Sequence, residues 1–323
     1  MAMTRWRRRL MFLGLASLLL VAPAPGSAQL RTVKLAASSK VIVDNLPVFV
    51  GMHMKFYEEV GMKVEPSYFR GGGEVIRAIT THSTDLGLPG AGPSMIAIAR
   101  GERLKILASG VGALVGIVWL VEADSPLKSV KDLAGKKVGF SSPGSVTHQT
   151  IQVILKKEGV DNVQIVRVGA PGDSWAAVKN KVVDAGWHIL PAYYTLIAKK
   201  EARVLIDAEK YVTRYQQSVV AAMEDVIQKD PELIRNFLKA HAKAVRFIKE
   251  NAERTIQIWA EELQLPVEAV RLAYRDLNKD VFEPATAPKP ENLQGAMEEG
   301  LAVGAIKTPL DLTKIVDLRF LPK

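Results

Sequence analysis

Short apolar runs alternate with amphipathic segments along most of the chain. In its first part, runs rich in Val, Leu, Ile and Ala predict strands at 33–37, 63–68, 85–88, 104–109 and 115–122. Between them, apolar residues at helical spacing predict helices at 47–60, 74–81 and 93–100. This alternation is typical of an α/β fold built on parallel sheets.

A second α/β series follows from residue 127. Its apolar runs predict strands at 137–140, 163–168, 182–187 and 202–206, with helices at 146–157, 174–181 and 191–201. After one more strand at 218–223 the pattern becomes helical. Asp230 and Pro231 form an N-cap and first-turn pair that predicts the start of a long helix. Further helices are expected at 255–263, 266–276 and 290–303.

The order of these elements predicts two lobes joined by two chain crossings. We expect boundaries near 122–126 and 211–217, so that residues 29–122 and 218–323 form one discontinuous lobe and residues 123–217 form the other. Two crossings make a hinge, and a cleft between two lobes is a common place for a ligand. The predicted fold class is therefore α/β, with two lobes around a hinged cleft.

The first 28 residues have the pattern of an export signal. Four arginines between positions 5 and 9 precede an apolar run at 10–22 and the small residues Gly26, Ser27 and Ala28. We expect cleavage before Gln29, although an uncleaved anchor is the alternative. The chain contains no cysteine, so it has neither a disulfide nor the residue that carries a lipid anchor. These features predict a protein that diffuses freely in the periplasm.

Length and charge narrow the possible functions. The 295 residues left after cleavage suit two domains better than one. The net charge of +9 includes the four signal arginines, which leaves about +5 for the exported chain. The basic residues are scattered and do not interleave with aromatic ones, so we expect no nucleic-acid partner but some attraction for anions.

Five segments resemble one known family. They are 129–145 (SVKDLAGKKVGFSSPGS), 85–88 (DLGL), 183–185 (VDA), 230–233 (DPEL) and 310–321 (LDLTKIVDLRFL). Their order and spacing along the chain resemble those of the periplasmic substrate-binding proteins of ABC importers, and among these the group that binds nitrate, sulfonates, taurine and thiamine pyrimidines. The resemblance covers nearly all of the chain after residue 28.

The resemblance implies a type II periplasmic-binding-protein fold that closes on its ligand. It also implies delivery of the ligand to an inner-membrane permease powered by an ATPase, neither of which lies in this chain. Our own interpretation is a monomeric receptor without a cofactor, whose ligand is a small polar or anionic organic solute. The segment 187–191 (WHILP) departs from the "w-E-P" turn expected in this group, which leaves the ligand class open.

Candidate ligand-binding residues in the first lobe follow the carboxyl ends of predicted strands, where ligands bind parallel sheets. They are Ser38, Ser39, Asn45, Arg70, Gly71, Gly72, Gly90 and Ser94. Hydroxyls, amides and glycine-exposed backbone N–H groups at helix starts suit an anion. Helix capping and simple turns explain the same residues equally well.

The second lobe supplies the other candidates. They are Ser142, Gly144, Ser145, Thr147, Trp175, Trp187 and His188. The first four gather hydroxyls and amides at a predicted helix start, where partial positive charge accumulates. A tryptophan face suits a flat ligand, but it also suits packing between lobes. His241 falls among apolar helical positions and is expected in the core.

No motif predicts catalysis or metal binding. The glycine–serine segment 92–96 lacks the closing glycine of a nucleophile elbow, and no histidine pair has metal-ligand spacing. The absence of cysteine also argues against the cysteine-dependent pyrimidine synthase that shares the family's fold. We therefore expect a binding protein without metal or cofactor. The alternatives are the receptor of a tripartite secondary importer and a periplasmic enzyme.

Overall fold

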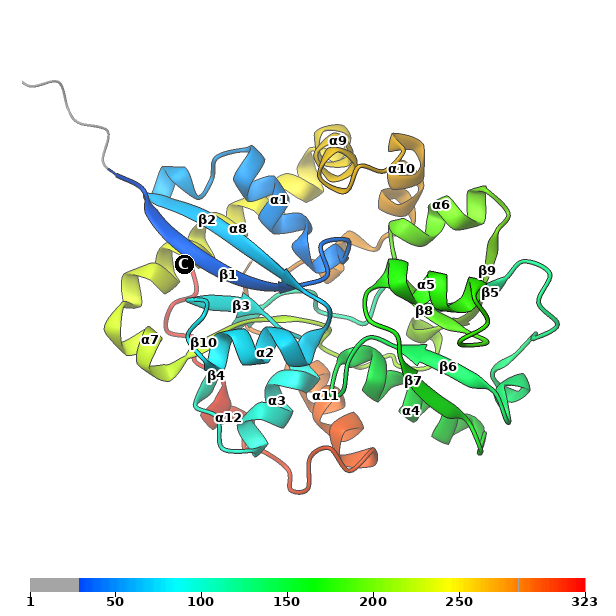
Figure 1. Cartoon of the computed structure of the whole chain (residues 1–323). Coiled ribbons are helices and arrows are strands. Elements are labelled where there is room, and N and C mark those ends of the chain that lie inside the picture. The colour runs from blue at the N-terminus through cyan, green and yellow to red at the C-terminus, as the bar shows by residue number, and fades with distance from the viewer. Residues whose placement is uncertain (1–28, 284, 323) are drawn as a thin grey trace, which may run out of the picture.

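The computed structural model describes residues 29–283 and 285–322, which fold into two α/β lobes (Figure 1). The predicted export signal at 1–28 lies outside the described residues. In Figure 1 the first lobe lies on the left and contains both ends of the described chain, while the green second lobe lies on the right.

The first lobe is built on a five-stranded sheet in the order β2-β1-β3-β10-β4. Its strands are β1 (Arg31–Ser38), β2 (Met62–Phe69), β3 (Leu86–Leu88), β4 (Leu104–Ser109) and β10 (Val219–Met223). β1 runs parallel to β2 and β3, whereas β10 runs antiparallel to β3 and β4. The prediction of parallel sheets is therefore only partly correct, because β10 enters the sheet after the chain has returned from the second lobe.

Helices surround this sheet, some packed on its two faces and others on neighbouring helices. They are α1 (Leu46–His53), α2 (Gly72–Thr80), α3 (Ala91–Ala99), α7 (Glu224–Lys229), α8 (Pro231–Glu250), α9 (Ala252–Leu263), α10 (Val267–Asp276), α11 (Pro290–Ala302) and α12 (Leu312–Ile315). Alternate residues of β1 serve the two faces: Leu35 packs in the cluster with α1 and α8, and Ala36 in the cluster with α2 and α3. The predicted cap is confirmed, since Asp230 accepts a 2.9 Å hydrogen bond from Leu233 N.

The second lobe combines a three-stranded antiparallel sheet with a parallel pair of strands. Its strands are β5 (Ile117–Glu122), β6 (Lys137–Phe140), β7 (Gln164–Arg167), β8 (Gly186–Ile189) and β9 (Ala202–Asp207). β5 lies between β8 and β9 and is antiparallel to both, while β6 and β7 are parallel. A bridge from Val138 to Ala185 connects the two groups. The helices are α4 (Val146–Glu158), α5 (Pro171–Lys179) and α6 (Ala192–Ala198).

Two adjacent segments connect the lobes. The chain leaves the first sheet after β4 through 110–116 and returns through 208–218. The two segments are hydrogen-bonded to each other from Gly110 N to Ser218 O at 3.0 Å and from Gln217 N to Val111 O at 3.0 Å. The first crossing precedes β5, so this strand belongs to the second-lobe sheet and not, as the predicted boundary near 122–126 had it, to the first lobe.

Two predicted elements differ in their bounds from the observed ones, each for a local reason. The helix expected at 47–60 ends at His53, because Lys55 adopts a left-handed backbone with φ of 58°, and only a short 3₁₀ turn follows at Glu58–Val60. The strand expected at 182–187 is shifted to Gly186–Ile189, since Lys181 is left-handed with φ of 58° and the next residues complete a turn. The short helices α7 and α12 were not predicted. Further 3₁₀ turns lie at Val43–Asn45, Val130–Leu133, Ala208–Lys210 and Lys279–Val281.

Candidate functional site

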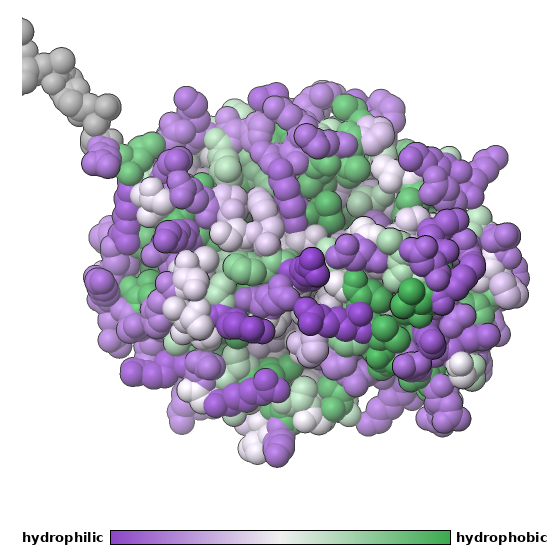
Figure 2. Space-filling view, in the orientation of Figure 1, coloured by the Kyte–Doolittle hydropathy of each residue, from purple (hydrophilic) through white to green (hydrophobic). Residues whose placement is uncertain are grey.

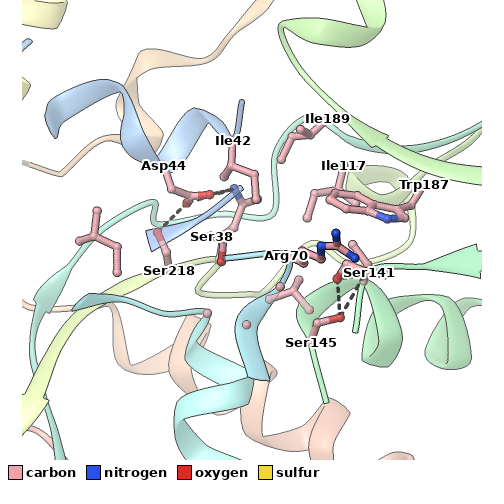
Figure 3. Close-up of a pocket in the computed structure, with 17 residues that line it drawn as sticks. Ser38, Ile42, Asp44, Arg70, Ile117, Ser141, Ser145, Trp187, Ile189 and Ser218 are labelled. Carbon is pink, nitrogen blue, oxygen red and sulfur yellow. Dashed lines mark hydrogen bonds between the residues drawn. The ribbon is translucent and has the colours of Figure 1, made fainter. Parts of the chain in front are cut away.

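A cavity lies between the two lobes, beside the ends of β1, β2, β3 and β8 (Figure 3). Its lining consists of Ser38, Ile42, Asp44, Arg70, Gly71, Gly72, Leu88, Gly90, Ile117, Ser141, Ser145, Val146, Thr147, Trp187, Ile189, Gln217 and Ser218. About 50 Å³ is open to the centre of a water molecule. One water centre needs roughly 10–15 Å³, so the space fits a few waters or a compact ligand.

The first lobe contributes Arg70 and glycine-rich helix starts. Arg70 follows β2 and is exposed, and Figure 3 shows its guanidinium turned toward Ser141 and Ser145 of the other lobe. Its backbone N–H donates to the Glu74 carboxylate at 3.0 Å, and its side chain forms no ion pair with a described residue. The guanidinium is therefore available to an anion in the cavity.

The second lobe contributes a cluster of hydroxyls at the start of α4. The Oγ atoms of Ser141 and Ser145 and the Oγ1 atom of Thr147 lie 2.9–3.0 Å from one another. Ser145 is the N-cap and accepts a hydrogen bond from His148 N at 3.2 Å. The backbone N–H groups of a helix start carry partial positive charge, so this end of α4 favours an anion beside it.

Apolar side chains close the remaining wall. Ile42, Leu88, Ile117 and Ile189 surround the polar groups, and the Trp187 ring lies beside them. The Trp187 Nε1–H donates to Gly169 O at 2.9 Å, which fixes the ring within its own lobe. An apolar wall with a few convergent polar groups is the usual construction of a small-molecule site.

The lobes touch directly beside the cavity. A Cβ built on Gly71 would overlap Ser142 Oγ and would lie 3.0 Å from Ser142 Cβ, and one built on Gly90 would lie 2.6 Å from Val146 Cγ2. A side chain at either position would force its neighbour to shift, so this close approach favours glycine. An ion pair from Arg167 to Glu74 at 3.0 Å also spans the boundary, where Figure 2 shows strongly hydrophilic side chains gathered on an otherwise mixed surface.

Eight of the predicted site residues lie together in the lining. They are Ser38, Arg70, Gly71, Gly72, Gly90, Ser145, Thr147 and Trp187. Trp187 reaches the cavity from within β8. Their contact with a ligand stays a prediction.

Seven predicted residues lie outside the lining. Asn45 is buried and donates to the carbonyl oxygens of Ser38, Ser39 and Lys40 at 3.0–3.3 Å, so it holds the loop after β1. The half-buried Ser39 belongs to that loop, where its carbonyl oxygen also accepts Ile42 N at 2.9 Å. The Ser94 hydroxyl donates to Gly90 O at 2.8 Å inside α3.

The other four lie outside the lining in the second lobe. Ser142 is buried against Gly71, and Gly144 forms the turn before α4 with φ of 73°. Trp175 packs on the cluster of Val118, Leu120 and Ala202. His188 is buried in β8, and burial lowers the pKa of its imidazole to about 4, which keeps the ring neutral.

The main polar group that sequence reasoning missed is Asp44. Its Oδ1 accepts the Ser218 hydroxyl at 2.6 Å, and both carboxyl oxygens lie 3.2 Å from the Gln217 amide nitrogen. Ser218 and Gln217 belong to the returning crossing and lie about 174 residues from Asp44 along the chain. The one available signal was an acidic residue between the apolar run 41–43 and the first helix.

Residues 29–283 and 285–322 contain neither a metal-binding cluster nor a membrane-spanning helix. No group of three or more His, Cys, Asp or Glu side chains is arranged to hold a metal ion. No helix in this part of the chain is both long and apolar enough to cross a bilayer. His241 is buried beside Tyr57, as expected of a core histidine.

The sequence is similar to one protein family and to two named periplasmic or solute-binding proteins. Residues 43–255 match the family described as NMT1/THI5 like. A protein of Escherichia coli (strain K12), provisionally named an aliphatic sulfonates-binding protein, is 29% identical over 71% of this chain and 69% of its own length. The taurine-binding periplasmic protein of the same strain is 27% identical over 57% of each chain.

Solved structures show the same architecture at lower identity. The alkanesulfonate-binding protein SsuA from Xanthomonas axonopodis pv. citri, bound to MOPS, superposes with a TM-score of 0.75 and 19% identity over 90% of this chain and 99% of that one. Together with the arrangement of the two lobes, this likeness identifies the fold as that of periplasmic binding proteins. The chain belongs to the NMT1/THI5-like family.

Proposed function

We propose that the protein is a solute-binding receptor that captures a small organic anion in the periplasm and delivers it to the permease of an ABC importer. The observation that carries this proposal is the cavity between the lobes, in which Arg70 faces the hydroxyl-rich start of α4. Relatives named for sulfonates and taurine support the same class of ligand.

Binding in this cavity would couple ligand to lobe closure. Arg70 comes from the first lobe and Ser145 from the second, so a ligand that contacts both makes its full set of contacts only when the lobes meet. Such a ligand favours the closed arrangement by the difference in its affinity for the two states. The permease would then recognise the closed receptor.

The remaining parts of the proposal concern the state of the exported chain. The receptor starts at Gln29 after signal cleavage, has no lipid anchor, acts as a monomer and is not an enzyme. The absence of cysteine from the whole sequence supports the lack of a lipid anchor and of thiol chemistry.

A thermal-shift screen of the chain from residue 29 tests the function. The panel contains alkanesulfonates, aminosulfonates, nitrate, aromatic carboxylates and pyrimidines. A ligand at 100 times its Kd adds about 2.7 kcal/mol of stability, which corresponds to a Tm increase of roughly 4 °C at this chain length. Failure of every organic anion to raise the Tm would contradict the proposal.

Calorimetry on variants then tests the site. We expect Ser145→Ala and Trp187→Ala to weaken binding of any compound found in the screen. Ser129→Ala and Trp175→Ala are matched controls, because Ser129 caps another helical turn and Trp175 packs away from the cavity. If all four variants bind as the parent does, the site lies elsewhere.

A further inference from the structure

The two ends of the cavity carry side chains of opposite kind, one acidic and one basic. In Figure 3 Asp44 and Ser218 lie on one side, and Arg70, Ser141 and Ser145 lie on the other. Asp44 is the acidic residue and Arg70 the basic residue of the lining. A plain anion would satisfy Arg70 but would place negative charge in the same small space as a carboxylate.

The hydrogen bonds around Asp44 fix it as an acceptor. Val111 N donates to Ser218 Oγ at 3.0 Å, so the Ser218 hydroxyl hydrogen is directed to Asp44 Oδ1. Val115 N donates to Gln217 Oε1 at 2.8 Å, which turns the Gln217 amide NH₂ group toward the same carboxylate. Each partner is itself oriented by the backbone of the other crossing segment.

The charge of Asp44 has no counter-ion in the described chain. Burial raises the pKa of its carboxyl, and the hydrogen bonds from Ser218 and Gln217 oppose that rise. The nearby Lys40 is paired with Glu262 at 2.9 Å, and no described Lys or Arg forms an ion pair with Asp44. A half-buried carboxylate with neutral donors only is costly to ionise unless a cation joins it.

The carboxylate retains room for one more donor. Two ionised oxygens offer about four acceptor positions, and the described bonds involve the Ser218 hydroxyl and the Gln217 amide. Asp44 also lines the cavity, so a donor on the ligand can reach it.

We propose that the ligand is a compact zwitterion whose protonated amine binds Asp44 while its acid group lies between Arg70 and the start of α4. This inference rests on the proposed function and narrows its ligand class from organic anions to amino acids of the sulfonate or carboxylate type. The small volume of the cavity favours a short spacer between the two charged groups.

Pairs of compounds that differ only in the amine test the inference on the unmodified chain from residue 29. The pairs are 2-aminoethanesulfonate with ethanesulfonate and 3-aminopropanoate with propanoate, titrated by calorimetry at pH 7.5. We expect the amine to strengthen binding about tenfold or more in at least one pair, the size of one charge-assisted hydrogen bond.

The variant Asp44→Asn identifies the group responsible. It keeps the shape of the side chain and removes the charge, so we expect it to abolish the preference for the amine while the amine-free partner binds as well as before or better. Glu65→Gln is the matched control, because Glu65 is exposed on β2 and pairs only with Lys63. The Tm of each variant shows whether it is folded.

The outcomes separate this inference from the function on which it rests. Equal binding of amine and amine-free partners by the parent chain, or an unchanged preference in a folded Asp44→Asn variant, would overturn the zwitterion and leave the anion receptor intact. Absence of binding by every acid would overturn both.

Discussion

The two lobes present different surfaces to the same cavity. The first lobe brings glycines to its helix starts, and α2 begins at Gly72 without a side-chain cap. The second lobe brings hydroxyls, and α4 begins at Ser145 with its cap in place. The glycines of the first lobe allow close contact because they have no side chains. The second lobe instead presents polar groups that are already arranged before a ligand arrives.

The largest expected effect comes from adding a side chain at Gly71, on the first-lobe side of the cavity. Gly71→Val would place methyl groups where Ser142 lies, and although a serine hydroxyl can rotate away, its Cβ at 3.0 Å from the new Cβ cannot. We expect at least 100-fold weaker ligand binding, measured by calorimetry, and a larger radius of gyration in X-ray scattering. Gly172→Val is the control, since nothing lies within 4 Å of that position. Ser142→Gly should partly restore binding to the Gly71 variant; no restoration would mean that the valine acts elsewhere.

The next effect concerns the guanidinium of Arg70, which the first lobe contributes to the cavity. Arg70→Met keeps length and removes the guanidinium, so binding of an acid should weaken by about 10- to 100-fold, because hydrogen bonds to charged groups contribute about 1.5–3 kcal/mol. Arg77→Met, on an exposed face of α2, is the control. A loss of equal size in both variants would indicate a general effect of net charge and not a contact.

A smaller effect concerns Glu299 on α11, a helix that packs against α3 of the first lobe and α4 of the second. Burial raises the pKa of the Glu299 carboxyl to about 7, and neither of its oxygens has a described hydrogen-bond partner. The folded state therefore holds this proton more tightly than the unfolded state, and the resulting stability is lost as pH rises from about 4.5 through 7. We expect the free energy of unfolding to fall by on the order of 2 kcal/mol from pH 5 to pH 8 through this group. Glu299→Gln should flatten that part of the profile in urea unfolding, and an unaltered slope would exclude Glu299 as its source.

The smallest effect concerns the cap of α4. Ser145→Ala should lower the free energy of unfolding by about 1 kcal/mol, the usual cost of losing an N-cap. Ser145→Asp should restore the cap and yet weaken binding of an acid, because it adds negative charge at the anion end of the cavity. If the aspartate variant binds an acid as well as the parent does, the start of α4 does not contact it.

Sequence patterns predicted most of the fold because the elements repeat at regular intervals. The strand Lys137–Phe140 and the start of α4 at Val146 lie where the apolar pattern put them. The shift of β8 was not predictable, since a left-handed Lys181 has no marker in its own side chain. The placement of β5 depended on pairing with β8 and β9, which lie 60 or more residues away.

Some residues of the candidate site were likewise predictable from the sequence, and others were not. Ser145 and Arg70 follow strand ends, so a rule about parallel sheets was enough to select them. Asp44, Gln217 and Ser218 come together only because the two crossings lie side by side, and no local pattern reports that contact. Ser94 and Asn45 were selected by the same rule, but each satisfies backbone carbonyl groups of its own segment.

The pairing of residues 110–116 with 208–218 limits how the molecule can change shape. Because the two connections are hydrogen-bonded to each other at 110–111 and 217–218, we expect them to bend together, which favours rotation of the lobes about one axis over swivelling or sliding. Any pair of reporter dyes attached across the boundary would therefore follow the same single degree of freedom, and the membrane partner could sense occupancy from that one coordinate wherever it touches the receptor.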